Sequence, residues 1–235
     1  LHSKTRSEQR QVLASLAAAK AAHQINDDLK RDEMLQLSHD TAMSYPELFD
    51  AVNTVKAEIL LDQSKSDEAI LILEKLNETH PNQIHIRKLL LRAYKQAGRL
   101  REVIKEARYL EKKKKIDPSY AKALIENSAT TIISSPSELL WESVYEQLTS
   151  EEQSKSAIAI AAARRYADRN DYKQVMKVLE KSYEAEYDEQ ILQEYVSLDV
   201  KEQQPQRLAK IQKWLENDSQ NPDLLRAAGH LCLLE

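Results

Sequence analysis

Apolar side chains recur at three- and four-residue spacing along most of this chain. Between residues 89 and 97 the pattern is carried by Leu90, Leu91, Tyr94 and Ala97. After residue 99 it continues through Leu100, Val103, Ile104, Ala107 and Leu110. Each set forms one apolar stripe on an α-helix. Alternating apolar runs bounded by Asn-Gly or Asp-Gly are absent from the sequence, so the pattern predicts an all-α protein.

Gly98 separates the two stripes and is one of only two glycines among the 235 residues. Helices commonly end in a residue of left-handed conformation, which glycine adopts without steric penalty. We therefore expect Gly98 to end the first helix and to let the chain reverse within about three residues. The two stripes then belong to a pair of antiparallel helices.

The same pattern recurs along the chain at an offset of 34 residues. Aligning residues 57–81 with residues 91–115 matches Ala57 with Leu91, Leu60 with Tyr94, Ala69 with Val103, Leu73 with Ala107 and Leu76 with Leu110. A third copy, 72 residues further on, fills the same slots with Ala163, Tyr166, Tyr172, Val175 and Leu179. We expect another, degenerate helix pair in the interval 118–148.

These positions resemble tetratricopeptide repeats, in which pairs of helices recur with a period of about 34 residues. The resemblance implies an α-solenoid of tetratricopeptide-like helix pairs. We expect residues 1–235 to form a single superhelix of about six helix pairs, truncated at both ends. The segment from Pro222 onward resembles a first helix without its second. An apolar face left uncapped there predicts either a missing C-terminal repeat or self-association.

Three longer segments carry a narrower resemblance. They are LAAAKAAHQINDDLKRDEML (16–35), the tract from SSPSELLWESV to EKSYEAEYD (134–188) and IQKWLENDSQNPDLLRAAGHLCL (211–233). Together they resemble the soluble part of the bacterial HemY family, a tetratricopeptide protein associated with late haem synthesis. The resemblance implies two membrane helices upstream of the repeats and anchoring in the bacterial inner membrane, with the repeats on the cytoplasmic side.

The same resemblance implies a non-catalytic, membrane-tethered scaffold whose partners are proteins, among them enzymes of late protohaem biosynthesis. Two alternatives stay open from the residues alone. One is a generic peptide-binding repeat protein with a role in envelope assembly or as a co-chaperone. The other is a carrier that holds porphyrin or haem between its helices, for which His80 and His85 would be the ligands considered; their expected places at a helix end and on an outward face argue against it.

Composition weighs against catalysis and against nucleic acid as a partner. With Gly98 and Gly229 as the only glycines, neither a dinucleotide-binding loop nor a P-loop is possible. Six histidines show no HExxH pattern, and the single cysteine, Cys232, is expected to be a small core residue. We therefore predict no catalytic residue, no cofactor and no metal site. A net charge of -4 gives no general attraction to nucleic acid.

The candidate binding surface is the concave face of the array, which the first helix of each pair lines. The slots that face it hold Thr54, Glu58 and Asp62 in one repeat, His85, Lys88, Arg92, Lys95 and Gln96 in the next, and Arg164 and Asp168 in a later one. The second of these groups is basic. We predict that Lys88, Arg92 and Lys95 clamp an acidic partner segment through charge-assisted hydrogen bonds; the alternative is that these faces are merely solvated.

Overall fold

The computed structural model describes residues 2–43, 45–198 and 203–233, with side chains for all of these except residues 2–6, 46 and 47. No strand occurs in these ranges, so the all-α prediction is confirmed. The helices are α1 (His2–Gln24), α2 (Asp28–Ala42), α3 (Pro46–Asp62), α4 (Ser66–Thr79), α5 (Ile84–Ala97), α6 (Leu100–Lys112), α7 (Pro118–Ser134), α8 (Trp141–Glu146), α9 (Ser150–Gln153), α10 (Ser156–Ala167), α11 (Tyr172–Ala185), α12 (Glu189–Ser197), α13 (Gln204–Asn217) and α14 (Pro222–Leu233).

The chain divides into two compact units, residues 1–124 and residues 125–235, and the division falls inside α7. Each unit is an array of packed helices. The expectation of one continuous superhelix over residues 1–235 stays a prediction.

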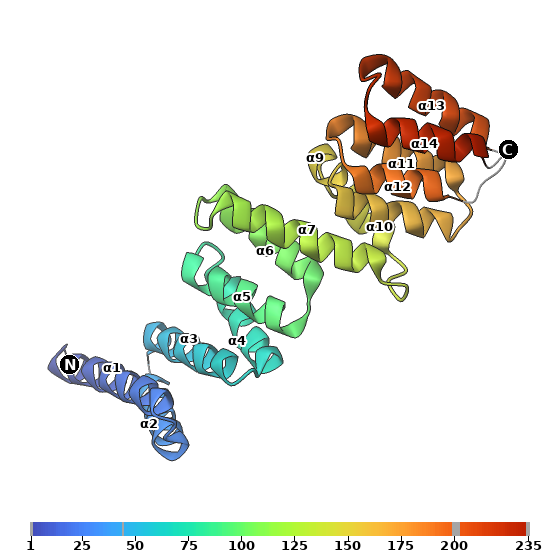
Figure 1. The fold of residues 1–235 in the computed structure, drawn as a ribbon. Helices are drawn as coiled ribbons and strands as arrows, with labels where there is room; N and C mark the ends of the chain where they lie inside the picture. The colour runs from blue at the N-terminus through green and yellow to red at the C-terminus, as the bar shows by residue number, and fades with distance from the viewer. Residues whose placement is uncertain (1, 44, 199–202, 234–235) are drawn as a thin grey trace. The chain divides into compact units, whose positions relative to one another are not determined.

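In the first unit, helices that follow one another in the chain pack as pairs: α1 with α2, α3 with α4 and α5 with α6 (Figure 1). The first helices also contact each other, α1 with α3 and α3 with α5. We call α1, α3 and α5 the first-helix layer of this unit. Consecutive pairing together with contact between alternate helices is the packing of an α-solenoid, as the repeat pattern predicts.

The second unit repeats part of this arrangement. Helix α10 packs on α11, and α13 packs on α14. Its first helices α10, α12 and α14 contact one another in sequence. In the interval 118–148, where a degenerate helix pair is predicted, α7 is followed by the six-residue helix α8. Residues 134–137, Ser-Ser-Pro-Ser, explain the shortening: proline cannot continue a helix, and serines compete for its backbone hydrogen bonds.

The aligned repeat positions form the cores of both units. Three apolar positions of the first copy have no exposed surface: Ala57, Ala69 and Leu73. In the second copy the exposed fraction is at most 1% for Val103, Ala107 and Leu110, and in the third copy it is zero for Ala163, Val175 and Leu179. Because a solenoid buries its apolar stripes only against neighbouring helices, this agreement supports the 34-residue register.

Gly98 ends α5 in the left-handed conformation, with φ of 68°, as predicted. No heavy atom lies within 4 Å of the position that a Cβ would occupy. Replacing Gly98 by alanine therefore adds torsional strain alone, which we expect to lower the free energy of unfolding by about 1 kcal/mol. Urea unfolding followed by far-ultraviolet circular dichroism measures the change.

The other glycine supplies a control of opposite sign. Gly229 lies inside α14 and also has open space around its Cβ position. Gly229→Ala should raise the free energy of unfolding by roughly 0.5–1 kcal/mol, because alanine loses less backbone entropy in a helix. A Gly98→Ala variant as stable as the wild type would contradict the assigned role of this turn.

Buried tyrosines make the fold sensitive to alkaline pH. Burial raises the pKa of Tyr145 to about 12, and burial is also the main cause of the raised pKa of Tyr94 and of Tyr195. Between pH 10 and the raised values, the unfolded chain has lost protons that the folded chain keeps. The free energy of unfolding should therefore fall by up to about 1.4 kcal/mol per pH unit for each such tyrosine.

Urea midpoints measured from about pH 9 to about pH 11 test this slope. Tyr145→Phe removes one of the titrating groups, so its stability should fall less steeply above pH 10 than that of the wild type. A variant and a wild type with the same pH slope would show that Tyr145 titrates alike in the folded and unfolded chains.

Candidate functional site

Five of the ten residues predicted to face the groove share one helix and one face. His85, Lys88, Arg92, Lys95 and Gln96 all lie on α5 with exposed side chains. They can do so because the opposite side of α5 is buried in the core through Ile86, Leu89, Leu90 and Ala93. Arg164 lies on α10 and belongs to the second unit.

Carboxylates of α3 connect the first-helix layer on both sides. Glu58 contacts α1 and α5 at once: its Oε2 lies 2.6 Å from Lys20 Nζ, and its Oε1 lies 2.8 Å from His85 Nε2. Asp62, one turn further along α3, repeats this arrangement. Glu58 therefore occupies a predicted groove slot but is already paired on both sides.

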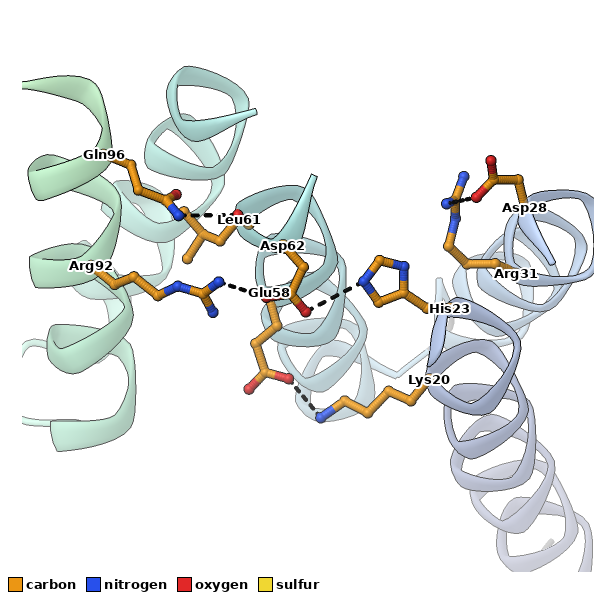
Figure 2. A network of polar contacts seen from close by, with 9 residues as sticks. All are labelled: Lys20, His23, Asp28, Arg31, Glu58, Leu61, Asp62, Arg92 and Gln96. Atoms are coloured by element: carbon orange, nitrogen blue, oxygen red, sulfur yellow. Dashed lines mark hydrogen bonds and ion pairs between the residues drawn. The ribbon is translucent and has the colours of Figure 1, made fainter. Parts of the chain in front are cut away.

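Figure 2 shows the contacts of Asp62 and the neighbouring backbone. Asp62 Oδ1 accepts a hydrogen bond from Arg92 Nη2 at 2.6 Å, and its Oδ2 lies 3.3 Å from His23 Nε2. Gln96 Nε2 donates to the carbonyl oxygen of Leu61, 3.2 Å away, in the last turn of α3. Exposed ion pairs of this kind contribute about 0.2–1 kcal/mol each, so they orient side chains more than they stabilise the fold.

These pairs divide the exposed basic residues of α5 into two groups. Arg92 and His85 each have a carboxylate partner on α3. Lys88 has no hydrogen-bond or ion-pair partner among the residues that the structure describes. Lys95 donates from Nζ to the hydroxyl oxygen of Tyr120 at 2.8 Å. An acidic ligand would have to compete with Asp62 for Arg92, whereas it would meet no carboxylate at Lys88 or Lys95.

A pocket of about 350 Å³ lies between α5 and the start of α7. We call it the α5–α7 pocket; its lining consists of Lys88, Leu91, Arg92, Lys95, Gln96 and Tyr120. None of these six side chains is a carboxylate. The Tyr120 ring is 45% exposed and faces Lys95, whose Nζ lies 5.2 Å from the ring centre. The pocket thus combines three basic side chains, of which Arg92 is paired with Asp62, with an accessible aromatic residue.

A second pocket, in the other unit, differs in charge. It has a volume of about 340 Å³ and lies between α12 and α14. Its charged lining residues are of both signs: Glu189 and Asp223 against Arg226. Arg226 Nη2 is 3.3 Å from Asp223 Oδ1, so part of this charge is already compensated. The pocket favours no sign of ligand charge. The α5–α7 pocket is the candidate site because its basic lining favours an anionic ligand.

Arg164 is engaged within its own unit. Its Nε and Nη2 donate to the two carboxylate oxygens of Glu194 on α12, at 2.9 and 2.7 Å. This hydrogen bonding raises the pKa of Arg164. Such a two-pronged pair fixes the guanidinium toward α12. The role of Arg164 as a groove residue for a partner stays a prediction.

The predictions for histidine and cysteine have mixed outcomes. His80 ends α4 as expected, and its Nε2 lies 2.7 Å from Asp50 Oδ2. These two residues line a polar pocket of about 630 Å³ beside the α4–α5 loop. No cluster of three metal-ligating side chains occurs within residues 2–43, 45–198 and 203–233. The prediction for Cys232 is wrong: its side chain is exposed, because the buried stripe of α14 runs through Leu224, Ala227 and Leu231.

Sequence reasoning missed three residues of this region. Lys20 and His23 were not predicted to face the groove. They are three residues apart on α1 and so share one helix face, which was the available signal. Tyr120 lies two residues after Pro118, in the first turn of α7. Its position at the start of a helix that begins a new repeat was the signal that could have identified it. Its aromatic ring completes the pocket that the basic residues begin.

The described residues include no helix that is both long and apolar enough to cross a membrane. The comparisons with known proteins add no relative: no family model, no curated protein and no solved structure matches this chain.

Proposed function

We propose that this protein is a non-catalytic scaffold that binds other proteins, and that its α5–α7 pocket receives an acidic segment of a partner. The observation that carries this proposal is the contrast along α5. Arg92 is neutralised by Asp62, whereas Lys88 and Lys95 flank a pocket whose lining contains no carboxylate. Partner carboxylates placed there gain charge-assisted hydrogen bonds without displacing an internal ion pair.

The further part of the proposal rests on the resemblance of residues 16–35, 134–188 and 211–233 to the HemY family. We propose that the repeats are tethered to the bacterial inner membrane by upstream helices and gather enzymes of late haem synthesis. Gathering raises the effective concentration of the next enzyme to the millimolar range for short tethers, so a reactive porphyrin spends less time free. The carrier alternative receives no such support, since His80 and His85 both face carboxylates.

Affinity purification of the full-length protein from its native host, followed by quantitative mass spectrometry, tests the proposal. The variant is Lys88→Glu/Lys95→Glu. Its matched control is Lys75→Glu/Lys105→Glu, which changes the charge equally at exposed positions on α4 and α6. We expect haem-pathway enzymes to co-purify with the wild type and the control and to be lost in the variant.

Two other results have definite meanings. Recovery of chaperones or envelope-assembly proteins, lost in the Lys88→Glu/Lys95→Glu variant, would favour the peptide-binding alternative over the haem assignment. The pocket would remain the binding site in that case. Partners that bind the variant as well as the control would refute the pocket as the binding site.

A further inference from the structure

We infer that the segment bound at the α5–α7 pocket carries an apolar side chain between two carboxylates, in the order acid, any residue, apolar residue, any residue, acid. This inference rests on the proposed function, because it specifies the partner of the same site. It follows from the spacing of the two lysines on α5 and from the surface that lies between them.

The spacing sets the distance between the carboxylates. Lys88 and Lys95 are seven residues apart, which is about 10.5 Å along an α-helix. In an extended segment, side chains four residues apart lie on one face about 13 Å from each other, and those two residues apart about 6.6 Å. The four-residue spacing matches better, and flexible lysine stems cover the remaining difference. It also leaves one position on the same face between the two acids.

The surface between the lysines includes two apolar or aromatic residues. Leu91, one turn from Lys88 and from Lys95, lines the pocket together with Tyr120. Arg92 also lines the pocket, with its guanidinium paired to Asp62. An apolar side chain at the middle position therefore covers Leu91 and packs against the half-exposed Tyr120 ring.

The two lysines stay available for this ligand. Lys95 uses one N–H of its ammonium group for the Tyr120 hydroxyl, which leaves two donors for a carboxylate. Lys88 has all three donors available toward solvent, since it has no partner in the described part of the chain. The Tyr120 hydroxyl also holds Lys95 at the pocket, which lowers the entropy cost of pairing.

Fluorescence anisotropy with the full chain and a fluorescein-labelled peptide tests the inference. The probe is Gly-Ser-Asp-Ser-Phe-Ser-Asp-Ser-Gly. One control peptide replaces phenylalanine by serine, and a second places the two aspartates directly beside the phenylalanine. We expect the first control to bind about tenfold more weakly, because it loses the buried aromatic side chain. The second should bind roughly threefold more weakly, since it engages one lysine at a time.

Variants of the protein separate the inference from the proposed function. Lys88→Gln and Lys95→Gln should each lower the affinity for the probe peptide by about three- to fivefold, and Lys75→Gln should leave this affinity unchanged. Tyr120→Ser should abolish the preference for the phenylalanine peptide, and Tyr120→Phe should keep it. Circular dichroism checks that each variant is folded.

The outcomes are distinct. Equal affinity for the phenylalanine and serine peptides, with dependence on Lys88 and Lys95 retained, would overturn the inference and leave the proposed function intact. If no acidic peptide binds, or if neither Lys88→Gln nor Lys95→Gln changes the affinity, the proposed function and the inference are both overturned.

Discussion

Replacing Arg87 by methionine should lower the free energy of unfolding by about 3–5 kcal/mol, the usual cost of leaving one charge of a buried ion pair without its partner. Arg87 on α5 donates from Nη1 to both carboxylate oxygens of Glu106 on α6, at 2.8 and 3.0 Å. Only 5% of the Glu106 side chain is exposed. Its carboxylate therefore cannot replace the lost partner with water.

Arg87 also connects the pair to the preceding loop. Its Nε donates to the carbonyl oxygen of Pro81 at 3.0 Å, and its guanidinium carbon lies 3.9 Å above the centre of the Tyr109 ring. Tyr109 in turn donates from its hydroxyl to Asn82 Oδ1 at 3.2 Å. The substitution thus removes the centre of a network that joins α5, α6 and the α4–α5 loop.

Urea unfolding followed by circular dichroism measures this effect, because both tryptophans of the chain lie in the second unit and would not report on the first. Arg99→Met is the matched control: Arg99 pairs with Asp67 at 3.1 Å on the surface, so its loss should cost at most about 1 kcal/mol. The double variant Arg87→Met/Glu106→Leu should recover most of the stability. If Arg87→Met and Arg99→Met lowered the free energy of unfolding equally, burial would not determine how strongly the Arg87–Glu106 pair stabilises the fold.

Trp141→Ala should destabilise the second unit by about 3–5 kcal/mol, as expected for removal of a large side chain from a rigid core. Trp141 has no exposed surface and begins the short helix α8. Its ring makes an edge contact with Tyr166 at 4.9 Å between centres, and Tyr145 lies 6.4 Å away. Helix α8 is too short to be stable alone, so this contact attaches it to α10.

Trp214 fluorescence during urea unfolding reports the loss, since Trp214 remains in the variant and lies in the same unit. Trp141→Phe should cost less, because it keeps an aromatic ring in the cavity. Leu139→Ala provides the control: Leu139 is 78% exposed two residues away, and its replacement should change stability by at most about 0.5 kcal/mol. A Trp141→Ala variant as stable as Leu139→Ala would contradict the assigned packing of α8.

The helix pairs could be predicted from sequence because burial in a solenoid follows the apolar stripe. Ala69 and Val103 occupy the same slot 34 residues apart, and both are buried. Gly98 could be predicted because an isolated glycine between two stripes has one common structural use. Such local signals determine where helices begin and end and which face each one buries.

Positions set by polar tertiary contacts could not be predicted in this way. A helical pattern places Glu106 among solvated residues, and only its pairing with Arg87 makes its burial possible. The basic face of α5 was predicted as a uniform clamp, but Asp62 neutralises Arg92 and leaves Lys88 and Lys95 as the open charges. Spacing within one helix does not say which side chains a neighbouring helix has already engaged.

The most direct test of the binding site is a photo-crosslink from the pocket in the native host. A p-benzoylphenylalanine at Gln96 would face the α5–α7 pocket of the full-length protein, and the same group at Lys75 on α4 serves as the control position. The predicted result is a crosslink from position 96 to a partner segment that contains Asp or Glu, lost when Lys88→Glu/Lys95→Glu is added. Crosslinks that persist in that variant, or that reach only segments without carboxylates, would contradict the proposed site.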